Sequence, residues 1–272
     1  MIEKKYALLD TDFISKLHIT RKDDQNRLID KILELPDYQF LCHEQITFEL
    51  ERHNTTAIDW LQRKIADGVI QKYSDADLIV LLRLFYGKNA VSMFLFYLSN
   101  ACELFEAGFY DHYYKILEQN SEMPDADFII KIANCDENVG NDNNLGEIKT
   151  YLLQQILQTQ EEIKLYVFCS DDKNARDGLA YGGGIPCISA LSSFYILKRK
   201  LGMERDEARL YFDSWMQYHQ MYKQVDFKVH KDTKEMQLIK MNGYEIFDRI
   251  YDGTLTIMKN GNLKLVHTSS SK

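Results

Sequence analysis

Proline and glycine are scarce in this sequence, and its cysteines follow no recognisable pattern. The 272 residues include only three prolines and thirteen glycines, which argues against a fibrous or disordered chain. The five cysteines are odd in number and show neither a CxxC pair nor a zinc-binding spacing. They are Cys42, Cys102, Cys135, Cys169 and Cys187. We therefore expect reduced, mostly buried thiols and a cytoplasmic protein.

The sequence also lacks a net positive charge and a signal for membrane insertion. Its net charge of -8 is not that of a protein that binds nucleic acid through bulk charge, although a bound cation can reverse the field at one site. The N-terminal MIEKKYALLDTDF is too poor in apolar residues for a signal peptide. The most hydrophobic stretch, LIVLLRLFYGKNAVSMFLFYL, is interrupted by Arg83 and Lys88. We expect a buried helix pair there and no membrane span.

What the sequence does contain is an alternation of strand-like and helix-like segments. Its 45% hydrophobic residues are enough to build a core. Short apolar runs predict strands at 5–10, 37–43, 163–172 and 184–189. Helical spacing predicts helices at 25–35, 44–53, 143–160 and 190–202. This alternation is typical of an α/β fold with a parallel sheet flanked by helices.

Two further segments have a different character. The sequence from Ala57 to about Cys135 is long, aromatic and helical in pattern, which predicts a large helical insertion at 56–139. The tail alternates like antiparallel strands, and Asn260-Gly261 between TLTIMK and NLKLVH predicts a type I′ hairpin turn. We therefore expect a core of 1–55 and 140–221, the insertion, and a small C-terminal α+β extension at 222–272 with a β-hairpin.

Acidic residues stand where the predicted strands end. Asp10 ends the first strand, the pair Asp171-Asp172 ends the third, and Glu49 and Glu147 come early in helices that follow turns. Ligands of a parallel sheet bind beyond the carboxyl ends of its strands, so these residues would converge on one edge. Converging carboxylates raise each other's pKa unless a cation holds them together. Mg²⁺ and Mn²⁺ prefer such oxygen ligands and activate water for attack on a phosphodiester.

Four segments together resemble the PIN-domain family of metal-dependent nucleases. They are YALLDTDFISKL, FLCHEQITFEL, NNLGEIKTYLL and YVFCSDDKNARDGLAYGGGIPCIS, and they cover roughly 1–55 and 140–200. The resemblance implies a PIN-like catalytic core at 1–55 and 140–221 that binds Mg²⁺ or Mn²⁺. It also implies a nuclease that most often acts on RNA, as a toxin, in RNA processing or in defence. An antitoxin or another partner protein, and a homodimer, are associations that such nucleases use.

The resemblance also implies a role for individual residues. The catalytic acids would be Asp10, Glu49, Glu147 and Asp172. Among them, Asp10, Glu147 and Asp172 would hold the first metal ion, while Glu49 and Asp12 would bind a second ion or orient ligands. Supporting residues would be Asp12, Ser170, Asp171, Asn174 and Arg176.

Ordinary structural roles compete with each of these assignments. Asp10 or Asp12 would equally suit a helix N-cap box. Glu49 would suit an exposed helix surface, and Glu147 would suit a first helical turn, where the helix dipole favours an acid. The paired aspartates alone would suit a solvated turn or a helix cap. The run Lys198–Lys200 is a basic cluster that would track a phosphate backbone or simply form a solvated helix face.

Two other functions remain open from the sequence. LLDTDFI resembles the DxDx[TV] motif of haloacid dehalogenase-like phosphatases, but Ile14 stands at its last position and Glu49 and Glu147 stay unexplained. The chain would alternatively be a non-catalytic PIN-like scaffold that binds RNA or protein, with its acids used structurally. The low net basicity of the chain gives this last interpretation some weight.

Overall fold

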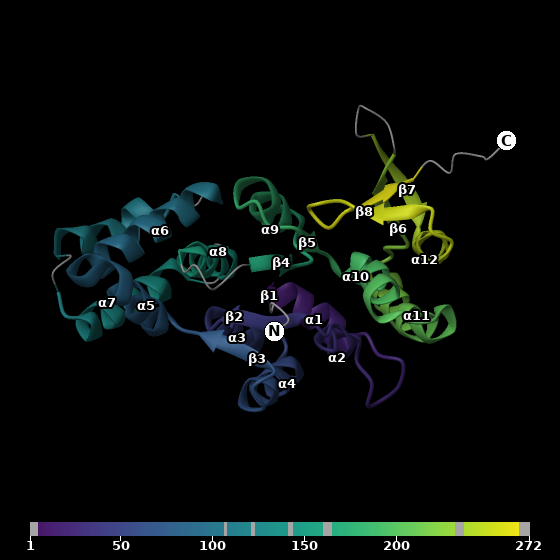
Figure 1. Cartoon of the computed structure of the whole chain (residues 1–272), viewed down its shortest axis with the longest axis horizontal. Helices are drawn as coiled ribbons and strands as arrows, with labels where there is room; N and C mark the ends of the chain where they lie inside the picture. The colour runs from purple at the N-terminus through teal and green to yellow at the C-terminus, as the bar shows by residue number, and fades with distance from the viewer. Residues whose placement is uncertain are drawn as a thin grey trace.

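A sheet of five parallel strands forms the centre of the computed structural model (Figure 1). The strands are β1 (Lys5–Leu9), β2 (Tyr38–His43), β3 (Ile70–Tyr73), β4 (Leu165–Cys169) and β5 (Cys187–Ile188). Their order across the sheet is β3-β2-β1-β4-β5. The predicted α/β class with a helix-flanked parallel sheet is therefore confirmed.

The structure describes residues 5–105, 108–120, 123–140, 144–159, 165–231 and 237–266. Parts of the predicted elements lie outside these ranges. They are residues 163–164 of the third predicted strand and the terminal residues, 143 and 160, of the helix predicted before it.

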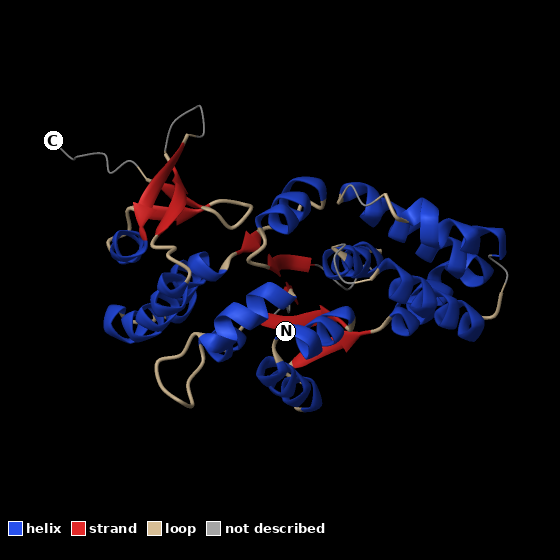
Figure 2. Cartoon of the chain, turned by 180° about the vertical axis from the view of Figure 1, so that it is seen from behind, coloured by secondary structure: helices blue, strands red, loops and turns tan. Residues whose placement is uncertain are grey.

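Helices cover both faces of the sheet, which Figure 2 shows from behind. Strand side chains alternate between the two faces, so Ala7 and Leu9 enter one core and Leu8 enters the other. The first core contains α1 (Thr11–Ile19), α2 (Leu28–Leu33), α3 (Gln45–His53), α4 (Thr55–Ala66), α10 (Ala190–Ile196) and α11 (Arg205–Met221). The second contains α5 (Asp75–Tyr86), α6 (Ala90–Leu104), α7 (Asp125–Val139), α8 (Leu145–Gln158) and α9 (Lys173–Asp177).

Strand β3 corrects the expectation that 57–135 is helical throughout. It pairs with β2 in parallel, from Ile70 opposite Phe40 to Tyr73 opposite His43, and it forms an edge of the sheet. Only Ile70 of its residues is buried, while Gln71 and Lys72 are exposed. A polar edge strand of this length carries no clear period-2 pattern, which is why the sequence did not reveal it.

The most hydrophobic stretch forms the expected pair of helices, α5 and α6. Gly87, with φ +53°, begins the short helical turn η1 (Gly87–Asn89) that separates them. Leu78 and Leu82 of α5 and Phe94 and Leu98 of α6 are buried in the second core, against α8. By length and composition alone, Asp75–Leu104 is the one helical stretch in the described chain that is apolar enough to cross a membrane.

Further short helical turns connect the main helices. They are η2 (Tyr110–Tyr114), η3 (Lys115–Asn120), η4 (Gly178–Gly182) and η5 (Leu197–Leu201). Helices α5 to α7 gather at one end of the molecule, and the C-terminal elements gather at the other end (Figure 1).

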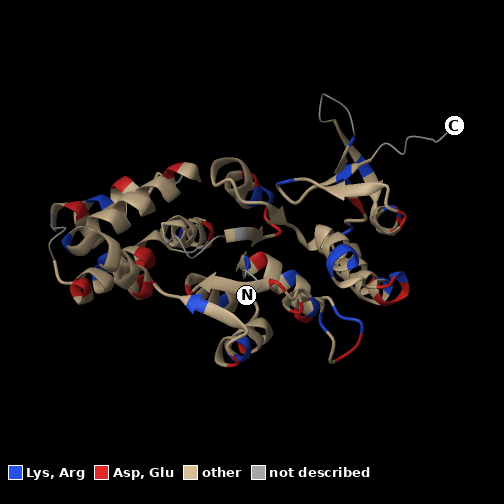
Figure 3. Ribbon diagram, in the orientation of Figure 1, with Lys and Arg blue, Asp and Glu red and all other residues tan. Residues whose placement is uncertain are grey.

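Lys198, in η5, donates to the carbonyl oxygens of Ile250 and Tyr251 at 2.9 and 2.7 Å. Lys198, one of the three residues of the predicted basic cluster, therefore binds the C-terminal extension. On the next helix, α11, acidic residues lie beside the basic ones (Figure 3).

The C-terminal extension forms a second sheet with one helix packed on it. Its elements are β6 (Asp226–His230), β7 (Leu238–Asn242), α12 (Gly243–Tyr251), β8 (Leu255–Ile257) and β9 (Leu263–Leu265). The strand order is β7-β6-β9-β8, with antiparallel β6–β7 and β8–β9 pairs and a parallel contact between β6 and β9. Phe247 and Ile250 of α12 join the same core as α10 and α11.

The predicted hairpin between β8 and β9 exists, but its turn is not of type I′. Gly261 has φ +79°, whereas Asn260 is not among the described residues with positive φ, and a type I′ turn requires positive φ at both. The Met258 N–H donates to the Asn262 carbonyl at 2.8 Å, and the Gly261 N–H donates to the Met258 carbonyl at 3.0 Å. These two hydrogen bonds define a three-residue hairpin loop, Lys259 to Gly261, with the glycine in the left-handed conformation.

Candidate functional site

The order of the strands creates a switch point between β1 and β4. The chain leaves β1 toward β2 and β3 on one side and returns to β4 and β5 on the other. Ligands of open α/β sheets bind at such a point, beyond the carboxyl ends of the strands. Asp10 directly follows β1, and Ser170 directly follows β4. The Asp10 N–H donates to the Cys169 carbonyl at 3.0 Å, which holds the two strand ends together.

Asp10 occupies the N-cap position of α1, yet its side chain makes no capping bond. Its carboxylate instead accepts a hydrogen bond of 2.8 Å from the Ser170 hydroxyl. Asp10 is only 3% exposed, and this burial raises its pKa well above the ordinary value for an aspartate. The charges of Glu147 and Glu49 raise the pKa further, while the bond from Ser170 acts in the opposite direction. The side chain is therefore directed into the site and does not cap the helix.

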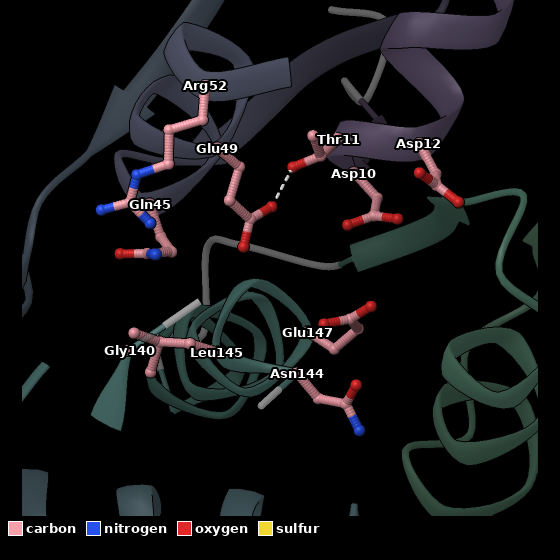
Figure 4. Close-up of a pocket in the computed structure, with 10 residues that line it drawn as sticks. All are labelled: Asp10, Thr11, Asp12, Gln45, Glu49, Arg52, Gly140, Asn144, Leu145 and Glu147. Carbon is pink, nitrogen blue, oxygen red and sulfur yellow. Dashed lines mark hydrogen bonds between the residues drawn. The ribbon is translucent and has the colours of Figure 1, made fainter. Parts of the chain in front are cut away.

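Glu49 reaches the same place from the middle of α3. Its carboxylate accepts a hydrogen bond from the Thr11 hydroxyl at the start of α1 (Figure 4). It also lies directly against Gly146 in the first turn of α8, where a β-carbon would come within 2.8 Å of the Glu49 carboxyl carbon. A larger residue at this position would displace the Glu49 carboxylate, so the glycine leaves room for Glu49 against the start of α8. The glycine that precedes Glu147 in the sequence is therefore explained by its contact with Glu49.

Glu147 enters from the first turn of α8, which begins after Asn144 in a left-handed conformation with φ 52°. Burial raises the pKa of Glu147 from 4.5 to about 7. The neighbouring charges of Glu49, Asp172 and Asp12 raise this pKa as well, whereas a hydrogen bond from its own backbone lowers it. At neutral pH Glu147 is therefore close to half protonated, so it is able both to hold and to release a proton.

These side chains line one pocket of about 280 Å³. Figure 4 shows Asp10, Glu49 and Glu147 directed toward a common space, from the start of α1, from α3 and from α8. The full lining consists of Asp10, Thr11, Asp12, Gln45, Glu49, Arg52, Gly140, Asn144, Leu145 and Glu147. Arg52 is exposed, and no ion pair or hydrogen bond joins its guanidinium to another described residue. The pocket therefore combines four carboxylates with one cation at its rim.

The residues after β4 divide between site and scaffold. Ser170 is fully buried, and its hydroxyl donates to Asp10 while accepting the Asp172 N–H at 3.0 Å. The Asp172 carboxylate caps α9 by accepting the Ala175 N–H at 2.7 Å, and it does not line the pocket. Its charge nevertheless acts on Glu147 and raises the pKa of that residue. The structure thus places Asp172 beside the pocket, in a capping role.

The remaining supporting residues make structural contacts. Asp171 accepts hydrogen bonds from the Lys16 ammonium at 2.7 Å and from the Ala190 N–H at the start of α10 at 3.0 Å. Asp12 lies 3.8 Å from the same ammonium and is half exposed. Asn174 is exposed on α9. Arg176 is buried and turned toward the C-terminal hairpin, where its guanidinium donates to the Asn260 carbonyl at 2.9 Å.

Six residues of the pocket were not predicted from the sequence: Thr11, Gln45, Arg52, Gly140, Asn144 and Leu145. Gln45, Glu49 and Arg52 stand at positions i, i+4 and i+7 of one helix, and this spacing places them on one face. Once Glu49 was selected, the same spacing would have indicated Gln45 and Arg52. The bond between Thr11 and Glu49 joins residues 38 positions apart and carries no sequence signal.

The donors of the pocket fit a hard divalent cation by their chemistry. Asp10, Asp12, Glu49 and Glu147 offer only carboxylate oxygens, which are the ligands that Mg²⁺ and Mn²⁺ prefer. Burial raises the pKa of Asp10 and Glu147 most, and the repulsion of the neighbouring carboxylates raises it further; a bound cation would relieve that repulsion. Across the described ranges, no three His, Cys, Asp or Glu side chains are already grouped closely enough to hold a metal ion.

Comparison of the chain with protein-family models, with curated proteins and with solved structures finds no match. The fold and the pocket define an α/β protein with an acidic site at the switch point of its sheet.

Proposed function

We propose that this protein is a metal-dependent nuclease with a PIN-like core that hydrolyses RNA phosphodiesters. One observation carries the proposal: Asp10, Glu49 and Glu147, far apart in the sequence, converge on a single pocket at the switch point of the parallel sheet. The alternative structural roles do not account for this convergence. Asp10 stands at an N-cap without capping, and Glu49 packs against a glycine that leaves room for it.

Asp10 and Glu147 would hold the first metal ion, with Glu49 and Asp12 available to a second, and Asp172 would act on the site through its charge. A bound Mg²⁺ or Mn²⁺ supplies an activated water and positive charge opposite the phosphate. Ser170 fixes the orientation of the Asp10 carboxylate by its hydrogen bond. This contact keeps one oxygen of Asp10 in place and leaves the other free of that bond.

Glu147 and Arg52 would contribute directly to the chemistry. Glu147 would share the first metal ion or position the attacking water, and its pKa of about 7 in the metal-free protein would fall once a cation binds. Arg52 lines the pocket one helical turn from Glu49, and its guanidinium lies beside Gln45 (Figure 4). A guanidinium binds a phosphate group through paired hydrogen bonds, so Arg52 would position the RNA backbone.

The test is a cleavage assay on labelled single-stranded RNA and DNA of mixed sequence, with Mg²⁺, with Mn²⁺ and with EDTA. We expect RNA cleavage that needs the metal and is lost in Asp10→Asn and Glu147→Gln. Asp206→Asn, an exposed first-turn acid of α11, is the matched control and should cleave like the unaltered protein. Full cleavage by Asp10→Asn would refute the proposal.

The same preparation separates the alternative functions. Turnover of an aryl phosphate without RNA cleavage would assign the protein to the phosphatases. A melting temperature that Mn²⁺ does not raise would indicate a scaffold without metal, because a ligand that binds the native state raises the melting temperature.

A further inference from the structure

A second hollow of about 270 Å³ opens beside the acidic pocket, at the carboxyl ends of β2 and β3. The two hollows share four residues, namely Gln45, Arg52, Gly140 and Leu145. The two hollows are therefore adjacent, and Arg52 is one of the residues that border both. None of the functions considered so far uses this second space.

The floor of the second hollow is a buried network of charges. Lys149 is completely buried, and its ammonium lies 2.7 Å from an Asp75 carboxylate oxygen and 2.9 Å from one of Asp136. The other Asp75 oxygen lies 3.2 Å from Nε2 of His43. Because Nδ1 of His43 accepts the Gln45 N–H at 3.1 Å, the ring proton sits on Nε2 and is donated to Asp75. These partners hold the floor rigid.

The walls of the hollow offer an aromatic ring and carboxylate oxygens that are able to accept further hydrogen bonds. Phe48 of α3 lines the hollow and is 48% exposed, so its ring is accessible to a ligand there. Ala133 of α7 faces it with a small side chain. Glu137 is exposed, and Glu44 uses one oxygen to accept the Asp75 N–H at 3.3 Å, so both retain acceptor sites.

We propose that this hollow is a subsite for one guanine base of the RNA strand whose adjoining phosphate lies in the acidic pocket. The proposal rests on the proposed nuclease function. Unpaired bases of RNA are recognised by stacking on an aromatic ring and by hydrogen bonds to their edges, and Phe48 supplies the ring. Guanine presents two adjacent N–H donors on one edge, and a carboxylate accepts both. Uracil has only one such donor between two carbonyls, which a carboxylate repels.

The size and the position of the hollow favour a single base. Its volume lies just below the 300–1,000 Å³ typical of ligand pockets, which suits one base better than a larger ligand. Arg52 stands between the two hollows, where the phosphate that follows the base would pass. One guanidinium would then neutralise the backbone between a base site and a cleavage site.

The first test measures binding without any cleavage. Guanosine and uridine are titrated into the full chain in EDTA and followed by ligand-observed NMR. We expect guanosine to bind at least about ten-fold more tightly than uridine, and Phe48→Ala to weaken guanosine about ten-fold, since stacking on a ring is worth that much. Phe96→Ala on α6 is the matched control, because Phe96 is 54% exposed elsewhere. Equal binding of the two nucleosides would overturn the proposal.

The second test blocks the hollow and maps cleavage. Ala133→Trp fills the space from an exposed position of α7, and Ala66→Trp places the same ring on the exposed end of α4. We expect cleavage beside guanine in the unaltered protein and in Ala66→Trp, and loss of that preference in Ala133→Trp. Cleavage without base preference, together with no guanosine binding, would refute the subsite and leave the nuclease standing. Guanosine binding that Ala133→Trp abolishes, without any cleavage, would support the base site and refute the nuclease.

Discussion

The Glu49 carboxylate lies directly against the backbone of Gly146, and through this contact two helices share one pocket. A β-carbon at position 146 would come within 2.8 Å of the Glu49 carboxyl carbon. Glu147 is the next residue along α8, so the contact that admits Glu49 also sets the position of Glu147. The geometry of the acidic site therefore depends on the absence of a β-carbon at Gly146.

Gly146→Ala is expected to disturb the site more than the fold. The new methyl group would push the Glu49 carboxylate out of its place, and because this is the flexible end of a side chain the cost in stability should be about 1 kcal/mol, the low end for overpacking. We expect a clear loss of RNA cleavage and of Mn²⁺ stabilisation, measured by product formation and by thermal melting. Gly108→Ala is the control, since a β-carbon at Gly108 meets no atom within 4 Å.

A second substitution checks the cause of the Gly146→Ala effect. Glu49→Ala removes the colliding carboxylate, so the double variant should regain most of the stability that Gly146→Ala loses. Stability losses that simply add would show that the methyl group collides with something else.

The stability of the metal-free protein should fall as the pH rises. The folded-state pKa of Glu147 is about 7, against an ordinary value of 4.5, so the folded state binds its proton more tightly. The stabilisation is complete below about pH 4.5 and is lost as the pH rises toward 7, and it amounts to about 3 kcal/mol. Asp10, whose pKa is also raised, acts in the same direction.

Urea unfolding in EDTA at pH 5 and pH 8 measures this loss. Glu147→Gln has no proton to lose and should show a smaller difference between the two pH values, while the exposed Glu137→Gln should behave like the unaltered protein. Mn²⁺ should reduce the loss, because it favours the ionised carboxylate. A Glu147→Gln variant with the full pH dependence would contradict the assignment.

Lys149→Met should destabilise the protein strongly. The substitution preserves volume but leaves the buried carboxylates of Asp75 and Asp136 without their cation, which typically costs 3–5 kcal/mol. Denaturant unfolding measures this loss. Lys115→Met, which removes an exposed ion pair with Asp111, should change little. Adding Asp75→Asn and Asp136→Asn to Lys149→Met should recover part of the loss, and no recovery would contradict this explanation.

Arg176→Ala should loosen the C-terminal extension and the end of β4 together. The guanidinium donates to the carbonyl oxygens of Ser170 at 3.0 Å and Asn260 at 2.9 Å, and to the Asn262 side chain at 3.2 Å. Their loss inside the protein should cost roughly 3 kcal/mol. Lys should not replace Arg here, because its ammonium does not reproduce the planar fork.

Hydrogen exchange over 255–265 and urea unfolding measure the effect of Arg176→Ala. Lys173→Ala, on the exposed side of the same helix, is the control and should stay within about 0.5 kcal/mol of the unaltered protein. Unchanged exchange in the hairpin would show that other contacts hold it.

The predictable part of the fold is the part with strong local patterns. The runs that became β1 and β2 are buried on both faces, and their apolar sequence signals this directly. Strand β3 was not predicted because its residues are largely exposed at the edge of the sheet. The hairpin at Asn260-Gly261 was predicted, but its turn type was not. Long-range hydrogen bonds determine the shape of the turn: Asn260 accepts one from Arg176 through its carbonyl and donates one to Asp177 through its side-chain amide.

The site was predictable as far as strand ends and helix starts determine it. Asp10, Glu49 and Glu147 reach the pocket as the topology requires. The resemblance gave Asp172 to the metal and Asp171 a supporting role. The sequence could not show that both make backbone capping bonds, because those bonds depend on where α9 and α10 begin. Arg176 likewise looked like part of the motif, whereas two of its partners, Asn260 and Asn262, lie 84 and 86 residues away in the hairpin.

The hairpin turn also covers the outer edge of β5. The Cys187 N–H, which points away from β4, donates to the Lys259 carbonyl at 2.6 Å, and Gly261 lies close against the Cys187 carbonyl. An open strand edge is a template on which other chains pair and aggregate. The extension therefore covers an edge that would otherwise be open, and a shortened chain that ends after α11 would expose β5 to neighbouring copies of itself.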